Sequence, residues 1–230
     1  MPIRFARVWF VSLALLLAAR SPAAPPNVVF LFADDMRADS LAALGNPVVK
    51  TPTLDALVQR GFAFRNAYCL GGNSAAVCTP SRNMLLSGNA YFRWKDFQPP
   101  QGGKGAISPG DGPNWPLAMR AAGYETYHEG KRGNTATLIQ AKFEHNLYIN
   151  ENADRTGGEP GKQIADDVVK FLRERKDPRP FFLYLAFGNP HDPRVADAKY
   201  MALYDREKIP LPKNFLPQHP FNNGEMTVRD

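Results

Sequence analysis

The chain has 230 residues, of which 44% are hydrophobic and 22% charged, values that are ordinary for a globular protein. Its 18 Gly and 21 Pro indicate many loops, but they stay below the content of about 25–30% that is typical of disordered chains. This composition excludes a collagen, a coiled coil, a disulfide-rich miniprotein and a protein with many membrane spans. The net charge of +6 leaves a nucleic-acid partner open at this point.

The first 23 residues have the pattern of a secretory signal peptide. Two arginines precede the apolar run Val8–Ala19, and small residues follow at Ala23 and Ala24. The run is too short for a stable membrane span, although an uncleaved anchor remains the alternative. Cleavage removes three arginines and no acidic residue, which lowers the net charge to +3. We therefore predict that residues 1–23 are a signal peptide, that the protein is periplasmic or secreted, and that no nucleic acid is its partner.

Apolar runs and amphipathic stretches alternate along the remaining chain. In chain order, the predicted elements are a buried strand at Asn27–Ala33, a helix from Pro52 to Gly61, a strand at Phe62–Tyr68, helices at Pro80–Gly88 and Trp115–Ala122, a strand at Tyr124–His128, a helix at Ile164–Leu172 and a buried strand at Phe181–Phe187. Surface loops are predicted at Phe97–Asn114, Ile149–Pro160 and Ile209–Asn223. Strands that alternate with helices predict an α/β fold, with a mixed, mostly parallel sheet flanked by helices.

Polar residues follow three of the predicted strands. Asp34 and Asp35 come after the first strand, Lys131 follows the strand that ends near His128, and His191 follows the last. In open α/β sheets, ligands bind outside the carboxyl ends of the strands. Two acids, a lysine and a histidine that meet at one edge would form a site for processing an anion.

The two cysteines, Cys69 and Cys78, differ in their surroundings. Their spacing is not a zinc pattern, and from the spacing alone they are either one disulfide or two buried thiols. Cys69 has no context that suggests chemistry. Cys78, in contrast, begins the run Cys-Thr-Pro-Ser-Arg, which ends at Arg82 and continues as Asn-Met-Leu-Leu-Ser-Gly to Gly88. A helix N-terminus at Cys78 would favour an anion, and the guanidinium of Arg82 would face back toward the same anion.

The run Cys78–Gly88 resembles the sulfatase signature. The stretches Asn27–Arg37, Thr51–Leu57 and Gly61–Ala67 also resemble that family, so the likeness covers the chain from about Asn27 to His191. The chain is similar to the type I, formylglycine-dependent sulfatases of the alkaline-phosphatase-like superfamily. The resemblance implies that a formylglycine-generating enzyme oxidises Cys78 to formylglycine, and that the substrate is a sulfated small molecule or polysaccharide, with a carbohydrate sulfate favoured.

The resemblance also implies a role for each matching residue. The modified Cys78, together with Asp34 and Asp35, would bind a divalent cation, usually Ca²⁺ in this family. Formylglycine carries an aldehyde, which would hydrate to two hydroxyls on one carbon. One hydroxyl would attack sulfur and displace the alcohol, and the second would help to expel sulfate and so restore the aldehyde. Arg82 would hold the formylglycine, Lys131 would stabilise sulfate oxygens, and His191 would protonate the leaving oxygen.

Two departures from the family pattern limit this prediction. The family has a histidine two residues after the lysine, where this chain has Gly133, and His128 is not assigned that role. The remaining metal ligands of the family lie well beyond His191, so we expect residues 27–230 to be the N-terminal part of a catalytic domain whose fold is incomplete at the C-terminus. Two alternatives stay open: a phosphomonoester or phosphonate hydrolase of the same superfamily, and a truncated, non-catalytic sulfatase-like protein.

Overall fold

The computed structural model describes residues 24–72, 76–90, 113–217 and 220. The predicted signal peptide and most of the predicted loop at Phe97–Asn114 lie outside these residues. The strands are β1 (Val28–Phe32), β2 (Glu125–Gly130), β3 (His145–Tyr148) and β4 (Phe181–Ala186). The helices are η1 (Ala42–Leu44), α2 (Pro52–Arg60), α3 (Cys78–Ser87), α4 (Trp115–Ala121), α5 (Thr137–Gln140), α6 (Glu151–Thr156), α7 (Lys162–Glu174), α8 (Ala198–Met201) and η3 (Arg206–Lys208).

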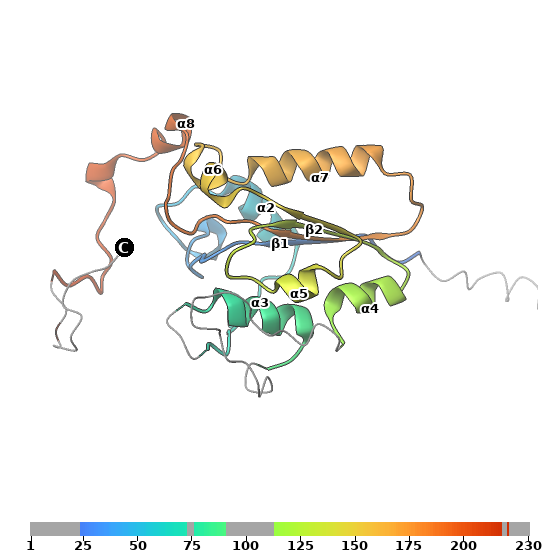
Figure 1. Ribbon diagram of the computed structural model, residues 1–230. Helices are drawn as coiled ribbons and strands as arrows, with labels where there is room; N and C mark the ends of the chain where they lie inside the picture. Colours follow the sequence, from blue (N-terminus) through green and yellow to red (C-terminus); the bar gives the residue numbers. More distant parts are fainter. Residues whose placement is uncertain (1–23, 73–75, 91–112, 218–219, 221–230) are drawn as a thin grey trace, which may run out of the picture.

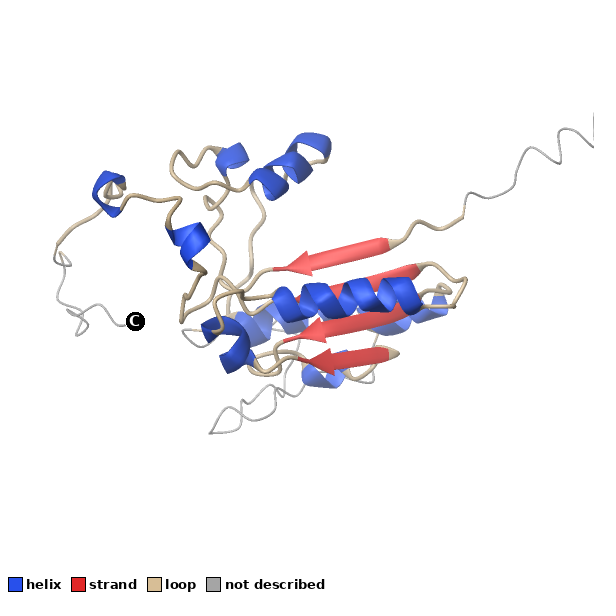
Figure 2. Cartoon of the chain, turned by 90° about the horizontal axis from the view of Figure 1, so that it is seen from above, coloured by secondary structure: helices blue, strands red, loops and turns tan. Residues whose placement is uncertain are grey.

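The four described strands form one parallel sheet in the order β1-β4-β2-β3. All strand arrows point the same way, toward α6 and the segment that carries α8 (Figure 2). This arrangement confirms the predicted α/β fold with a mostly parallel sheet. Because the strands are parallel, the segments that follow them all emerge at one edge of the sheet.

Helices cover both faces of the sheet. Helices α3, α4 and α5 lie against one face, and α7 lies against the other (Figure 1). Between the first layer and the sheet, a cluster around Leu86, Phe143 and Phe182 is buried. Beneath α7, a second cluster is built around Ile164, Val168, Leu183 and Leu185. The spacing of Ile164 and Val168, four residues apart, puts both on the buried side of α7, as the sequence predicts.

The prediction that β1 is buried on both faces is wrong for the described chain. Phe30 and Phe32 pack against the cluster around Phe182, but Val29 and Leu31 on the other face are 51% and 52% exposed. The reason is position: β1 lies at the edge of the four-stranded sheet, and the buried cluster under α7 is built from β2 and β4, not from β1.

Three local expectations also differ from the structure. The segment Phe62–Tyr68 is not a strand. Phe62 and Phe64 are 82% and 80% exposed, and their rings meet edge to face with centroids 4.9 Å apart. A short strand, β3, and a short helix, α6, were not expected, and α6 lies inside the predicted loop Ile149–Pro160.

None of the helices among the described residues is long and apolar enough to cross a membrane.

Candidate functional site at the carboxyl edge of the sheet

The register of the sheet brings the predicted site residues to one level. Ala186, the last residue of β4, pairs with Phe32 at the end of β1 and with Gly130 at the end of β2. The next residue after β2 is Lys131, whose backbone N–H donates to the carbonyl oxygen of Ala186 at 3.3 Å. The three strands therefore end side by side, and the segments that carry Asp34, Lys131 and His191 leave them together.

Cys78 stands in the first turn of a helix, as predicted. Helix α3 begins at Cys78, two residues earlier than expected, with Pro80 in the first turn, where its missing N–H is not needed. The Ser81 hydroxyl donates to the Cys78 carbonyl at 3.0 Å. The helix ends before Gly88, whose φ of 68° is left-handed and suits glycine. Both cysteines are free, so the disulfide alternative is wrong, and Cys69 is exposed and not a buried thiol.

Asp34 is the centre of the site. Its side chain is buried, the Lys131 ammonium donates a hydrogen bond to Oδ2, and Arg82 Nη2 lies 3.2 Å from Oδ1. Burial alone would raise the pKa of Asp34, but the hydrogen bond from Lys131 and the two cationic charges hold it below its ordinary value. The carboxylate is therefore ionised, and it fixes both cations at the edge of the sheet.

Arg82 is fully buried, and its charge is only partly compensated. The guanidinium lies over the Phe32 ring, 4.8 Å from the centroid. Apart from the ion pair with Asp34, its side-chain N–H groups have no hydrogen-bond partner among the described residues. Buried donors of this kind are costly to leave unpaired. They offer hydrogen bonds to an anionic group or to oxygens on the side chain at position 78.

His191 reaches the site from the segment that follows β4. Its Nδ1 lies 2.7 Å from the Asp192 carbonyl oxygen, and because a carbonyl only accepts, the proton stands on Nδ1 in that contact. Arg155 Nη1 donates to the same carbonyl at 2.8 Å and lies 3.4 Å from Nδ1. One ligand atom each from Asp34, Cys78 and His191 all lie within 4.8 Å of one another.

The Cys78 thiol is not activated as it stands. Its half-buried position raises its pKa, and the nearby Asp34 carboxylate raises it further, although Lys131 and Arg82 act in the opposite direction. The thiolate is the nucleophilic form of cysteine, and here it is disfavoured at neutral pH. Unmodified Cys78 is therefore poorly suited to attack an anionic substrate.

The described residues do not by themselves fit a complete calcium site. Ca²⁺ takes about 6–8 oxygen ligands, whereas the cluster of Asp34, Cys78 and His191 offers one carboxylate, a thiol and an imidazole. Both Asp34 oxygens already face cations. Asp35 has an exposed side chain and a left-handed φ of 61°, and it does not belong to this cluster.

The structure accounts for His128 and Gly133 differently. His128 is a core residue: it is fully buried, its Nδ1 lies 2.7 Å from Asn146 Oδ1, and burial lowers its pKa to about 4. Gly133 lies beside Glu151, whose Oε1 accepts the Gly133 N–H at 2.6 Å and would lie 3.3 Å from an added Cβ. A carboxylate therefore stands next to the position where the family pattern has a histidine.

The sequence reasoning missed Glu151 and Arg155. Both lie on α6, in a segment expected to be a surface loop, and they form an ion pair at 3.3 Å with side chains that are 20% and 15% exposed. The available signal was the spacing of four residues between an acid and a base, preceded by Asn150 as an N-cap whose side chain accepts from the Ala153 N–H.

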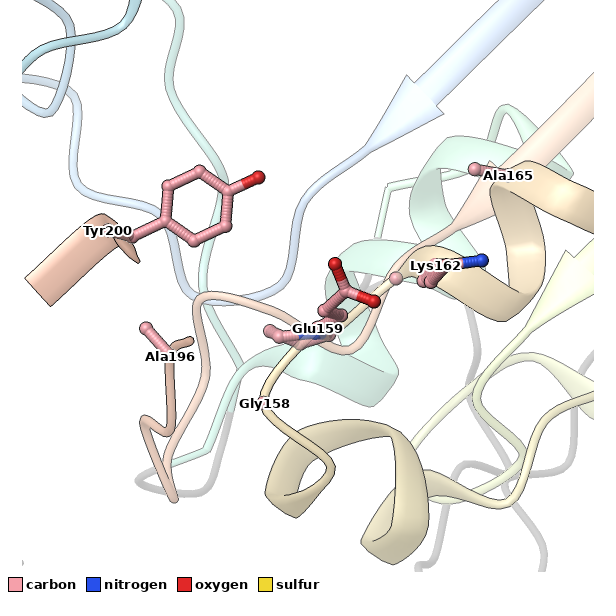
Figure 3. A pocket seen from close by; sticks show the side chains of 8 residues that line it. Gly158, Glu159, Lys162, Ala165, Ala196 and Tyr200 are labelled. Carbon is pink, nitrogen blue, oxygen red and sulfur yellow. The ribbon is translucent and has the colours of Figure 1, made fainter. Parts of the chain in front are cut away.

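A pocket of about 430 Å³ lies between the start of α7 and the segment after His191. Its walls come from Gly158–Lys162, Ala165, Ala196 and Tyr200, and the Tyr200 ring and Glu159 face the same hollow (Figure 3). Lys199 donates to Glu159 at 3.0 Å and joins the two walls. None of the predicted catalytic residues lines this pocket.

At its carboxyl edge, the parallel α/β sheet gathers a cysteine at a helix N-terminus, a buried carboxylate and two buried cations, the place where open α/β sheets bind ligands. The Sulfatase family profile matches residues 26–223. The chain belongs to the sulfatase family, a family of enzymes.

Relatives with known names agree with this membership. The chain is 26% identical to an arylsulfatase of Clostridium perfringens over 81% of its own length and 48% of the relative's. It is 35% identical to the human N-sulphoglucosamine sulphohydrolase over 77% of its own length and 34% of the relative's. The chain thus spans between a third and a half of the length of these relatives.

Solved structures show the same fold. A phosphonate monoester hydrolase of Agrobacterium radiobacter superimposes with a TM-score of 0.60 at 20% identity, covering 81% of this chain and 45% of that one. A 2-O GAG sulfatase superimposes with a TM-score of 0.55 at 23% identity, covering 72% of this chain and 35% of that one.

Proposed function

We propose that the protein hydrolyses a sulfate ester and that the nucleophile is a formylglycine formed from Cys78. The observation that carries the proposal is the convergence of Cys78, Asp34 and His191 within 4.8 Å, with Lys131 and Arg82 paired to the same Asp34. The raised pKa of the thiol supports modification, because the unmodified side chain is a weak nucleophile here.

Each residue has a task that its surroundings support. A hydrated formylglycine supplies two hydroxyls on one carbon. Arg82 holds that side chain through its unpartnered N–H groups, and Lys131 neutralises charge on the sulfate oxygens. His191 donates through Nδ1–H to the Asp192 carbonyl, and in its imidazolium form, with a second proton on the other ring nitrogen, it gives that second proton to the leaving oxygen.

The substrate class that we propose is a carbohydrate sulfate. The human relative is named as acting on a sulphoglucosamine, and another relative is an N-acetylglucosamine-6-O-sulfatase of Bacteroides thetaiotaomicron, 22% identical over 84% of this chain. The partner enzyme is one that generates formylglycine. The phosphonate hydrolase alternative predicts instead that a phosphonate monoester is hydrolysed faster than a sulfate ester of the same alcohol.

A divalent cation, Ca²⁺, belongs to the proposal as well, with Asp34, Asp35 and the modified Cys78 among its ligands. Its role would be to neutralise sulfate oxygens. The described residues supply too few oxygen ligands to complete the site, so no role above depends on it.

The decisive experiment is mass spectrometry of the peptide that contains Cys78, from protein produced together with a formylglycine-generating enzyme. We expect formylglycine at Cys78 and an unmodified thiol at Cys69, which is exposed and serves as the internal control. Cys78→Ala should abolish hydrolysis of an aryl sulfate, whereas Cys69→Ala should leave it unchanged. An unmodified Cys78, or activity that survives Cys78→Ala, would overturn the proposed nucleophile.

Export is the remaining part of the proposal. The basic and apolar pattern of residues 1–23 supports a cleaved signal peptide. N-terminal sequencing of the protein from its natural host should find a mature chain that begins after Ala23 or Ala24. A chain that still begins with Met1 in the membrane fraction would favour the uncleaved anchor.

A further inference from the structure

Helix α6 touches both loops that carry proposed catalytic side chains. It begins at Glu151, with two residues between it and the end of β3, and lies at the carboxyl edge of the sheet beside the start of α7 (Figures 1 and 2). Two of its side chains, Glu151 and Arg155, face the edge where Lys131 and His191 emerge. Neither residue belongs to the motifs that the sequence analysis singled out.

Glu151 binds the loop that follows Lys131. Its Oε1 accepts the backbone N–H of Arg132 at 2.8 Å and that of Gly133 at 2.6 Å. Both hydrogen bonds run from a backbone amide to the same carboxylate, and such charge-assisted hydrogen bonds are stronger than neutral ones. The first residues after β2 are thereby fixed, and with them the direction in which Lys131 leaves the strand.

Arg155 binds the loop that follows β4. Its Nη1 donates to the Asp192 carbonyl at 2.8 Å, and the same carbonyl orients His191. Its Nη2 lies 3.3 Å from Glu151 Oε2, so the planar guanidinium joins the two loops through one side-chain pair. A lysine has a single ammonium and cannot reproduce this fork.

Helix α6 is itself anchored to the sheet and to α7. Ile149, just before the helix, is buried, and its N–H donates to the Gly130 carbonyl at 3.0 Å. Asp154 is buried, and its Oδ1 accepts the Gly161 N–H at 2.8 Å, which ties α6 to the start of α7. The Glu151–Arg155 pair is therefore held by the core on both sides.

We propose that Glu151 and Arg155 are positioning residues that clamp the Lys131 loop and the His191 loop at a fixed separation. The inference rests on the proposed function, because it assigns the clamp to the placement of those two catalytic side chains. Misplacement of a catalytic group by about 1 Å can cost about 100-fold in rate, so the clamp should act on kcat more than on substrate binding.

The test compares Glu151→Ala, Arg155→Ala and the double variant, with alanine chosen because it preserves the helix. Each single change should lower kcat by about 10–100-fold and leave KM within about 3-fold. The double variant should be no worse than the poorer single one, because either change opens the same clamp. Losses that multiply in the double variant, or an unchanged kcat, would overturn the proposal.

Amide hydrogen exchange gives a readout that does not depend on activity. Each single variant should speed exchange about 10-fold or more in both loops, at 131–133 and at 189–192, while β2 and β4 stay protected. Loosening of only the directly contacted loop would show two separate contacts and no clamp. If the wild-type protein hydrolyses no sulfate ester, the proposed function fails, but the exchange result still decides the clamp.

Two further variants keep the test sharp. Asp166→Ala removes another ion pair four residues apart, the exposed Lys162–Asp166 pair on α7, which touches neither loop, and it should change neither kcat nor exchange. Arg155→Lys keeps the charge, and it should lose as much kcat as Arg155→Ala because the fork is gone. The clamp would be refuted if Arg155→Lys kept the wild-type kcat. It would also be refuted if Asp166→Ala lowered kcat as much as Glu151→Ala, because α6 would then have only a general structural role.

Discussion

Asp34 shows how one buried carboxylate organises the edge of the sheet. Its two oxygens face Lys131 and Arg82, so each cation is held by the same negative charge. In Lys131→Met, Asp34 keeps only Arg82, and we expect the free energy of unfolding at pH 7 to fall by about 1–3 kcal/mol. The Asp34 pKa is lowered in the folded wild type, so its stabilising effect is present above its ordinary value of 3.8 and is lost as the pH falls.

Urea unfolding at pH 7 and at pH 3 would check this expectation. The difference between wild type and Lys131→Met should shrink at the lower pH. Lys170→Met, on the exposed side of α7, is the control and should change stability by less than about 0.5 kcal/mol. Equal losses in the two variants would show that the Asp34–Lys131 pair is not what stabilises this edge.

Glu129 predicts a second, opposite dependence on pH. It lies under α7, and the Tyr127 hydroxyl donates to its Oε2 at 2.5 Å. Burial raises the pKa of Glu129 to about 7, with a smaller effect from the neighbouring Asp167. A raised folded-state pKa means that the stabilising effect is present below the ordinary value of 4.5 and is lost as the pH rises through about 7.

Glu129→Gln should therefore stabilise the fold at pH 8 by about 1–2 kcal/mol, because the neutral amide mimics the protonated acid. The gain should fall toward zero near pH 4.5. Denaturant titrations across this range would measure it. A variant that is less stable than wild type at pH 8 would mean that the ionised Glu129 has a compensating partner.

Among single residues, the sequence predicts those that gather around Asp34 and misses Glu151 and Arg155, which contact the loops after β2 and β4. Cys78 and Arg82 belong to one motif, and Lys131 directly follows β2, which fixes their place. Glu151 and Arg155 act through a tertiary contact between two loops, and no local pattern encodes which loops meet. The free, exposed Cys69 likewise follows from the fold around it and not from its neighbours in sequence.

Among the elements, the end of β2 depends on glycine. A Cβ at Gly130 would lie 2.6 Å from the Ala186 Cβ and would also collide with the Ala186 carbonyl oxygen, so the backbones of β2 and β4 would have to separate. Gly130→Ala should cost about 3 kcal/mol of unfolding free energy. At Gly133, an added Cβ would lie 3.3 Å from the Glu151 carboxylate and would collide with no backbone atom, so Gly133→Ala should cost less than about 1 kcal/mol.

Thermal and denaturant unfolding of the two variants would measure this contrast. If Gly133→Ala proved as destabilising as Gly130→Ala, the tight approach of β2 and β4 would not be the cause. The pair also separates stability from positioning, because Gly133→Ala displaces Glu151 and should lower kcat while the fold is retained.

Elements with a strong periodic or apolar signal are predicted well. Helix α7 and strand β4 lie where the sequence predicts them. The apolar residues of α7 are spaced to face one layer, and the continuous apolar run of β4 is covered on both faces. The segment Phe62–Tyr68 has the same apolar content but pairs with no described strand. Apolar content alone predicts burial but does not indicate which element a segment packs against. For the same reason, the sequence does not predict that one face of β1 is exposed.

For the whole molecule, the exposed face of β1 predicts association. Val29 and Leu31 are about half exposed on a strand whose outer edge is unpaired among the described residues. Unpaired edges with apolar side chains favour pairing with other chains.

We expect the chain from residue 24 onward, purified alone, to show a molar mass in light scattering that rises with concentration over the micromolar range. Val29→Lys combined with Leu31→Lys should keep it monomeric, whereas Leu138→Lys combined with Val169→Lys, on exposed sites of α5 and α7, should leave the association unchanged. Association that survives charges on β1 would place the adhesive surface elsewhere, with the exposed pair Phe62 and Phe64 as the next surface to test.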